Sequence, residues 1–184
     1  PMGMIPQSYL DGEMTKAFAG TPYQVRSTPQ GRNSVVRDDR PPCCGNNSCI
    51  PICPIQAKYD ATVHLARAEA VGARLIAQAV VDRIDIGADG RVSGVRYRRP
   101  DGSTALVTAR VFVLAAHAIE IPKLLLMSHG SRAPNGVANS SDQVGRHLMD
   151  HPVQLSYALS AQPVWPYRGP LSTSGVENTR LGDW

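Results

Sequence analysis

The chain has 184 residues, which is enough for one ordinary domain with a real core, and it carries a net charge of +4 with a pI of about 9.1. Its basic residues are scattered and are not interleaved with aromatic side chains, so we expect no nucleic-acid partner. No apolar run in the sequence approaches the length that would span a bilayer.

The first 42 residues are mostly irregular by their sequence pattern. Asp11 is predicted to cap a short helix over residues 12–19, and Gly20 to end it. A short strand is expected over residues 23–27. The rest of this stretch, rich in proline and charge, is predicted to be loop.

All four cysteines lie within eleven residues, at Cys43, Cys44, Cys49 and Cys53. A disulfide framework would spread its cysteines along the chain, so this clustering indicates a metal centre, and the C-x-x-x-C-P ending is typical of an iron–sulfur site. The adjacent Cys43 and Cys44 point apart in an extended chain, so three ligands fit one site better than four. A zinc site, whose paired C-x-x-C spacing is missing, and disulfides remain the alternatives.

Regular structure is predicted after the cysteine loop. Apolar residues at helical spacing predict a helix over residues 62–71. Alternating strands with Gly/Asp and Pro-Asp-Gly turns between them then predict a three-stranded antiparallel meander, whose strands are expected at residues 74–86, 92–97 and 104–109.

The next stretch contains the first candidate cofactor contact. Residues 111–116 are apolar without alternation, which is typical of a central parallel strand, and a helix is expected over residues 121–128. The small Ala115 and Ala116, followed by His117, allow a ligand to approach the backbone close to a helix N-terminus. Many α/β proteins contain such a turn, so the signal is weak by itself.

Residues 144–152 contain two histidines, His147 and His151, with Asp150 between them. They could form a metal site, but Pro152 ends any helix here, so a shared helical face is not secured. We therefore favour a local hydrogen-bond network oriented by Asp150. A strand is expected at residues 154–160.

Together these stretches resemble a known family. Residues 113–128 resemble the second signature of the glucose–methanol–choline (GMC) oxidoreductases, and residues 144–152 are similar to the family's VGxNLxDHP stretch. The cysteine loop resembles the branch of bacterial FAD-dependent glucose, gluconate, fructose and sorbitol dehydrogenases. The resemblance covers about residues 1–170, and Gln56 stands where relatives commonly have glycine.

The resemblance implies an α/β fold. It implies part of a Rossmann-like FAD-binding domain at residues 61–150, preceded by an irregular segment with the cysteine loop at 1–60 and followed by the start of a substrate domain at 151–184. FAD is expected to lie near Val80, Val81, Ala115, Ala116 and His117. By the spacing of the branch, a 3Fe–4S cluster is expected on Cys43, Cys49 and Cys53, with Cys44 unligated.

The resemblance also implies a reaction. The enzyme would oxidise a hydroxyl group of a sugar, polyol or aldonic acid by hydride transfer to flavin, as a dehydrogenase rather than a peroxide-forming oxidase. Electrons would leave through the cluster toward a cytochrome c subunit. A small chaperone-like subunit and a periplasmic location, held at the inner membrane through a partner subunit, are implied as well.

Two further expectations concern what this sequence lacks. The glycine-rich βαβ unit that grips the FAD pyrophosphate and the family's histidine base are not found in it, so we expect an internal fragment that is inactive alone. The alternative is a non-catalytic electron-transfer or metal-binding module. Such a module would explain the cysteines but neither the meander nor the flavin-turn signature.

Overall fold

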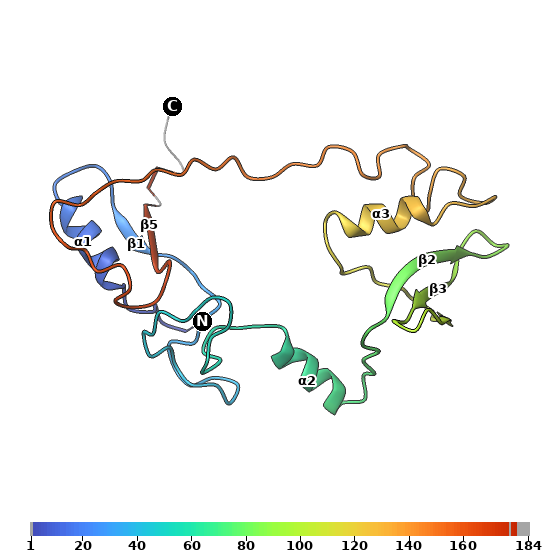
Figure 1. Ribbon diagram of the computed structural model, residues 1–184, viewed down its shortest axis with the longest axis horizontal. Helices are drawn as coiled ribbons and strands as arrows, with labels where there is room; N and C mark the ends of the chain where they lie inside the picture. The colour runs from blue at the N-terminus through green and yellow to red at the C-terminus, as the bar shows by residue number, and fades with distance from the viewer. Residues whose placement is uncertain (1, 177, 180–184) are drawn as a thin grey trace. The chain divides into compact units, whose positions relative to one another are not determined.

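The computed structural model describes residues 2–176 and 178–179 and separates the chain into two units. Unit 1 comprises Pro1–Ala73 and Ser156–Trp184, and unit 2 comprises Arg74–Leu155. Helices and strands both occur (Figure 1), which confirms the predicted mixed α/β class. Among the described residues, no helix is both long enough and apolar enough to cross a membrane.

Unit 1 begins with helix α1, Tyr9–Ala17. The predicted start and cap were wrong: Ser8 is the N-cap, and its hydroxyl accepts a hydrogen bond from the Asp11 N–H at 3.2 Å. Asp11 instead accepts the Ser8 N–H at 3.3 Å, so the two residues form a capping box. The reciprocal pair satisfies two helix-start donors, which places the helix start before Asp11 rather than after it.

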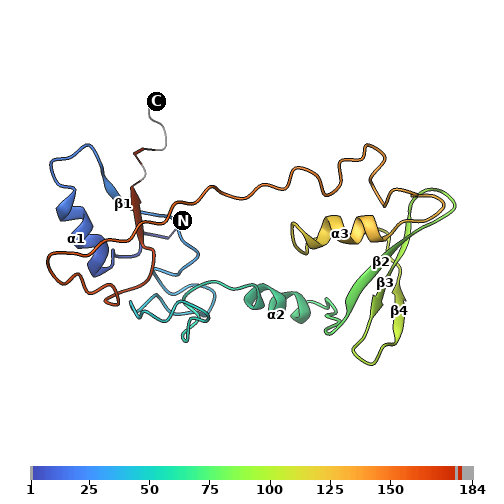
Figure 2. The ribbon, with the colours of Figure 1, turned by 45° about the horizontal axis from the view of Figure 1, so that its top comes forward.

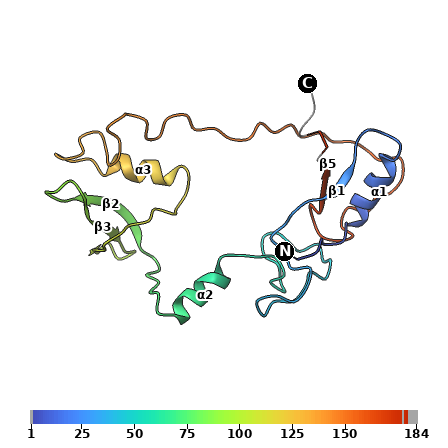
Figure 3. The same cartoon turned by 180° about the vertical axis from the view of Figure 1, so that it is seen from behind.

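A two-stranded antiparallel sheet joins the two sequence segments of unit 1. Strand β1, Val25–Ser27, pairs with β5, Ser174–Val176, with Arg26 opposite Gly175. Figure 3 shows this pair beside α1. The partner strand β5 was not predicted, because three residues carry too little pattern to reveal a strand.

A buried hydroxyl ties β5 to the start of α1. Thr173 is only 1% exposed, and its Oγ1 accepts the Ser8 N–H at 3.0 Å while donating to the Asp11 carboxylate. Thr173 therefore connects the capping box to the distant end of the chain.

Replacing Thr173 with valine is expected to destabilise the chain by about 1–3 kcal/mol, because the Ser8 N–H and the Asp11 carboxylate would each lose one hydrogen bond without a change of shape. Urea unfolding followed by circular dichroism measures the loss. Thr15→Val is the matched control, because the Thr15 hydroxyl is exposed and makes only exposed contacts among the described residues, to the Asp11 carbonyl at 2.8 Å and to the Gln7 side chain at 3.5 Å. Equal midpoints for the two variants would contradict the assigned role of Thr173.

Helix α2, Thr62–Ala70, follows the cysteine loop and confirms the predicted helix. The Asp60 side chain accepts the Thr62 N–H at 2.9 Å, which satisfies a donor at the start of the helix. Gly72, with φ of +97°, ends the helical stretch as expected.

Unit 2 contains the predicted meander. Strands β2 (Val80–Ile86), β3 (Val92–Arg98) and β4 (Thr104–Val107) form an antiparallel sheet in the order β2-β3-β4 (Figure 2). The first strand is shorter than predicted: it begins at Val80 and not at Arg74. Gln78, with φ of +51°, interrupts the extended backbone just before it.

Strands β2 and β3 place two arginines opposite each other, Arg83 and Arg96. The Asp85 carboxylate binds both, at 3.1 Å from Arg83 Nε and 2.7 Å from Arg96 Nε. The hydrogen bond from Arg96 is the main reason that the pKa of Asp85 lies below its ordinary value. Burial opposes this lowering, and the charge of Arg96 together with Arg83 adds to it.

The sign of the shift predicts a pH dependence. A carboxyl whose folded pKa is lowered contributes stability above its ordinary pKa of about 4, and loses that contribution as the pH falls through the folded value. We therefore expect the stability difference between wild type and Asp85→Asn to be constant at neutral pH and to shrink below pH of about 4. Urea midpoints of both proteins, measured from acid to neutral pH, test this. A stability difference that stays the same below pH of about 4 would refute it.

Helix α3, Glu120–Met127, packs on β2 but has no buried residue of its own. Ser128, just after the helix, accepts the Ile84 N–H at 2.9 Å through its hydroxyl and is 3% exposed. Ile84, Tyr97 and Val137 are the buried apolar side chains of this unit among the described residues. The helix was predicted one residue later at each end.

Two predicted strands are absent. Residues 111–116 and 154–160 have no strand assignment, and Val113 is 82% and Tyr157 92% exposed. An apolar run becomes a central strand only where neighbouring strands accept its backbone hydrogen bonds, and none of the described strands pairs with either run. The three predicted domain ranges, 1–60, 61–150 and 151–184, stay a prediction.

Candidate functional site

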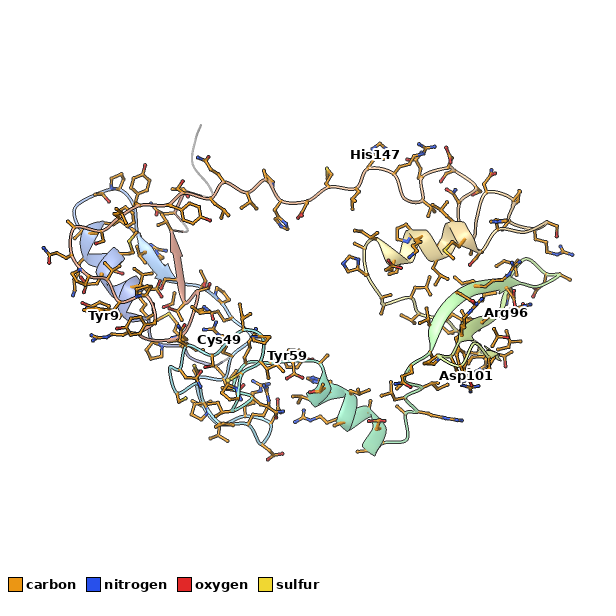
Figure 4. All side chains as sticks on the ribbon, viewed as in Figure 1. Tyr9, Cys49, Tyr59, Arg96, Asp101 and His147 are labelled. Carbon is orange, nitrogen blue, oxygen red and sulfur yellow. The ribbon has the colours of Figure 1, made fainter. Side chains whose placement is uncertain are left out.

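The cysteine loop of unit 1 carries the thiols predicted to bind a cluster. All four cysteines are free: Cys49 is buried, Cys43 and Cys53 are half-buried and Cys44 is exposed. Figure 4 labels Cys49 within this loop. The disulfide alternative finds no support, because no cysteine is paired.

In the part of the chain that the structure describes, no group of three or more His, Cys, Asp or Glu side chains lies close enough to hold a metal ion. The structure therefore does not draw Cys43, Cys49 and Cys53 together into a metal centre. Their ligation stays a prediction, and so does the alternative of a zinc site.

The donor set nevertheless suits a thiolate centre. Burial by itself would raise the pKa of the Cys53 thiol, but the backbone N–H groups of Lys58, Ile55, Ala57 and Gln56 outweigh burial and lower it. Thiolates are the iron ligands of iron–sulfur proteins, and hydrogen bonds to sulfur tune their clusters. The buried Nε–H of Arg40, whose guanidinium binds the Gln56 carbonyl of this loop, has no acceptor among the described residues. It is therefore a cationic donor that could bind an anionic group.

Cys49 is fixed through its backbone. The Lys58 ammonium donates a hydrogen bond to the Cys49 carbonyl at 3.0 Å, and the Cys49 thiol lies 3.9 Å from the Asn46 carbonyl. Lys58 itself is held by an antiparallel bridge to Arg32. The sequence placed Lys58 beside the cysteine loop but did not show that it binds the backbone of Cys49.

Three residues after the last cysteine, the backbone has an unusual conformation. Gln56 has a φ of +54°, in the left-handed region that glycine occupies without strain. The sequence resemblance put a glycine at this position in relatives, and the observed angle gives that preference a physical reason.

The flavin candidates of unit 2 are all accessible. Val80 is 70% and Val81 42% exposed, and Ala115, Ala116 and His117 are exposed as well. The His117 Nδ1 accepts the Ile119 N–H at 3.1 Å, and its carbonyl accepts the Ile121 N–H at 2.9 Å. His117 thus shapes the turn into α3, and flavin contact by these five residues stays a prediction.

The structure brings the two sequence signatures of unit 2 together at a groove of about 380 Å³. One wall is α3 and the other is the turn at residues 145–148. Gly145 lies in this turn with a φ of +79°, a left-handed backbone that favours glycine, and a Cβ there would be in ordinary contact with Leu126 Cδ1 at 3.4 Å. The lining is Ala118, Ile119, Pro122, Lys123, Leu126, Met127, Gly145, Arg146 and Leu148.

The groove is suited to binding and not to acid–base or nucleophilic chemistry. Its walls are mainly apolar, and its only charged side chains are Lys123 and Arg146. Both cations are paired, with Glu120 at 2.9 Å and with Asp142 respectively. No carboxylate, thiol or imidazole belongs to the lining.

The two histidines of residues 144–152 do not form a site. His147 has a φ of +56°, so the segment is not helical there, and His151 is almost fully exposed. The Asp150 carboxylate accepts the His151 N–H at 2.7 Å. This contact agrees with the local hydrogen-bond interpretation.

Comparison with known proteins identifies the class. Residues 24–153 match the GMC oxidoreductase family, which is well over half of the chain. The chain belongs to the GMC oxidoreductases, whose members act on CH–OH groups and whose fold implies FAD. The family predicted from the two signatures and the cysteine loop is confirmed.

Particular relatives are similar over most of the chain. The chain is 42% identical to the fructose dehydrogenase large subunit of Gluconobacter japonicus over 185 aligned positions, which cover 100% of this chain and 34% of that protein. It is 34% identical to the 6'''-hydroxyparomomycin C oxidase of Streptomyces lividus, over 82% of this chain and 30% of that protein. The chain therefore spans about a third of the length of these relatives.

Proposed function

We propose that this chain is part of an FAD-dependent dehydrogenase that oxidises a hydroxyl group of a sugar, polyol or aldonic acid. The similarity to a fructose dehydrogenase large subunit extends over the whole chain and supports a sugar-type substrate. Family membership supports FAD as the cofactor. The proposal concerns the complete enzyme, of which these residues form one section.

The proposal of a dehydrogenase depends mainly on the clustered cysteines of the cysteine loop. Three thiols, Cys43, Cys49 and Cys53, lie within eleven residues, all free, with one buried and one whose pKa is lowered by backbone N–H groups. We propose that they ligate a 3Fe–4S cluster and that Cys44, which is exposed, does not. Such a cluster supplies a one-electron exit that a peroxide-forming oxidase does not need.

The residues of unit 2 have a binding role in this proposal. FAD, when bound, supplies the hydride acceptor. Val80 and Val81 at the start of β2, and Ala115 and Ala116 before α3, offer small or apolar surface to it. His117 holds the turn before α3 through its Nδ1, which keeps the backbone there open to a ligand.

The proposal extends to partners and location. A cytochrome c subunit would accept the electrons, a small chaperone-like subunit would accompany the enzyme, and the complex would lie in the periplasm at the inner membrane. A fructose dehydrogenase large subunit is by its name one part of a multisubunit enzyme, which supports a partnered arrangement.

Substrate-driven flavin reduction tests the function. The full gene product is mixed anaerobically with fructose, glucose, gluconate and sorbitol in turn, and flavin bleaching is followed by absorbance. We expect one of them to bleach the flavin, with rapid turnover when a dye acceptor is added and little hydrogen peroxide in air. Stoichiometric peroxide in air, without dye reduction, would show an oxidase and overturn the proposal.

A further inference from the structure

The two ends of the cysteine loop are joined by backbone hydrogen bonds to one residue. The Asn33 carbonyl accepts the Cys43 N–H at 2.8 Å, and the Asn33 N–H donates to the Ala57 carbonyl at 2.9 Å. Asn33 is 2% exposed and Ala57 1% exposed. The loop from Cys43 to Ala57 is thus closed at its base by a buried residue outside it.

A buried arginine reinforces the same closure. Arg40 is 8% exposed, and its Nη1 donates to the Gln56 carbonyl at 3.1 Å while its Nη2 lies 3.4 Å from Asn33 Oδ1. The Asn33 Nδ2 in turn donates to the Arg37 and Arg40 carbonyls at 3.1 and 3.2 Å. We call Asn33 and Arg40 the clasp, because each binds the other and each binds the exit of the loop.

The clasp also offsets a local strain. Gln56 occupies the left-handed region, which is unfavourable for a residue with a Cβ and persists only where the surroundings fix it. Arg40 fixes the carbonyl of Gln56, and the Gln56 N–H donates to the Cys53 carbonyl at 3.1 Å. The guanidinium therefore holds the turn that follows Cys53.

All three predicted ligands connect to this base. The Cys43 N–H donates to the Asn33 carbonyl. The Cys53 carbonyl accepts the N–H of Gln56, whose own carbonyl is bound by Arg40. The Cys49 carbonyl accepts a hydrogen bond from Lys58, the residue that follows Ala57. Cys44, the cysteine that we propose to be unligated, is the exposed one. Burying a guanidinium and an amide is unfavourable without partners, and this loop conformation provides partners for the Asn33 amide and for Arg40 Nη1 and Nη2, though not for Arg40 Nε.

We propose that Asn33 and Arg40 are positioning residues that keep the cysteine loop closed at its base, so that the loop retains its iron–sulfur cluster once the thiols have come together on it. The inference rests on the cluster assigned under the proposed function. It adds that cluster retention depends on two residues that are not ligands. Outer partners of metal ligands commonly change metal affinity by about 10- to 100-fold when removed.

The test compares Arg40→Met and Asn33→Ala in the full gene product with a matched control, Arg37→Met. The Arg37 side chain lies on the same segment and is 58% exposed, and its one charged partner among the described residues is Asp38, at 3.8 Å. Iron release to a chelator is timed, flavin content is measured in the same samples, and cysteine alkylation is located by mass spectrometry after iron removal.

We expect the two clasp variants to release iron about 10-fold faster or more, with flavin retained and the control unchanged. After iron removal, Cys49 should be alkylated slowly in wild type and control, and as fast as Cys44 in the clasp variants. Arg40→Lys keeps the charge but not the two guanidinium donors, so its rate of iron release should lie between those of wild type and Arg40→Met. If Arg40→Met does not fold, Arg40→Lys takes its place in the test.

The outcomes separate the two proposals. Wild-type protein that contains no iron would overturn the proposed cluster. In that case, slow alkylation of Cys49 in wild type and fast alkylation in the variants would still support closure of the loop by the clasp. A wild-type cluster that the variants retain equally well, with Cys49 still protected, would overturn the clasp and leave the cluster standing. Parallel loss of flavin and iron from the clasp variants, Arg40→Lys included, would show a general structural role and also overturn it.

Discussion

Replacing Cys49 with serine should remove the iron–sulfur signal from electron paramagnetic resonance spectra of the full gene product. Cys49 is the buried cysteine of the loop, 3% exposed, and its carbonyl is held by Lys58. A serine hydroxyl is a harder and weaker ligand for cluster iron than a thiolate. Flavin reduction by substrate should be spared, because hydride transfer comes first, whereas electron transfer to the cytochrome should be crippled.

Two other cysteine variants make the assignment specific. Cys44→Ser should keep the signal, since Cys44 is exposed and is not one of the three proposed ligands. Cys43→Ser should lose it. If the Cys44 variant loses the cluster while the Cys43 variant keeps it, the ligand set is wrong, whatever the Cys49 variant does.

Gly136→Ala should destabilise unit 2 by several kcal/mol, far more than Gly102→Ala, since an added Cβ would meet backbone atoms of α3 at a residue with a left-handed backbone. Gly136 has a φ of +99°, and a Cβ there would lie 2.9 Å from both the Leu125 carbonyl oxygen and the Leu126 Cα, which are backbone atoms of α3. Left-handed backbone contributes about 1–2 kcal/mol. Overpacking contributes about 1–3 kcal/mol. The loop would have to leave α3, which would also break the hydrogen bond from the Val137 N–H to the Leu125 carbonyl.

Gly102→Ala separates these two contributions. Gly102 has a similar φ of +83°, but nothing lies within 4 Å of an added Cβ. Its variant should therefore lose only about 1–2 kcal/mol. Urea unfolding of both variants measures the difference, and an equal loss would show that the close approach of Gly136 to α3 does not contribute to stability.

The meander and the helices could be predicted from the sequence because their signals are local. The Gly87–Gly90 and Pro100–Gly102 turns lie between alternating strands, and the hydrogen bonds that these strands need come from one another. The capping box was missed because Asp11 alone is a plausible cap, and only the pairing with Ser8 shifts the start of the helix.

Long-range pairing could not be predicted. Residues 111–116 have the composition of a buried strand, but composition does not supply a neighbouring strand, and Val111 and Val113 lie exposed. Strand β5 pairs with β1 across about 150 residues of sequence, at a position with no pattern of its own. Such contacts depend on which segments meet, which a single sequence does not state.

The candidate site was predicted in part. The clustering of the cysteines was enough to predict a metal centre, and the motifs at residues 113–128 and 144–152 were enough, with the cysteine loop, to predict the family. Asn33 and Arg40 were missed, because they lie in a stretch that the sequence predicted only to be loop. Their role follows from burial and hydrogen bonds, for which the sequence carried no signal beyond proximity to Cys43.

Native mass spectrometry of the full gene product, purified without air and combined with its visible spectrum, tests the proposed cofactor content most directly. We expect one FAD, together with the iron and sulfide of a single 3Fe–4S cluster, bound to each catalytic chain. A protein that carries flavin but no iron, or zinc in place of iron, would contradict the proposed electron route through Cys43, Cys49 and Cys53.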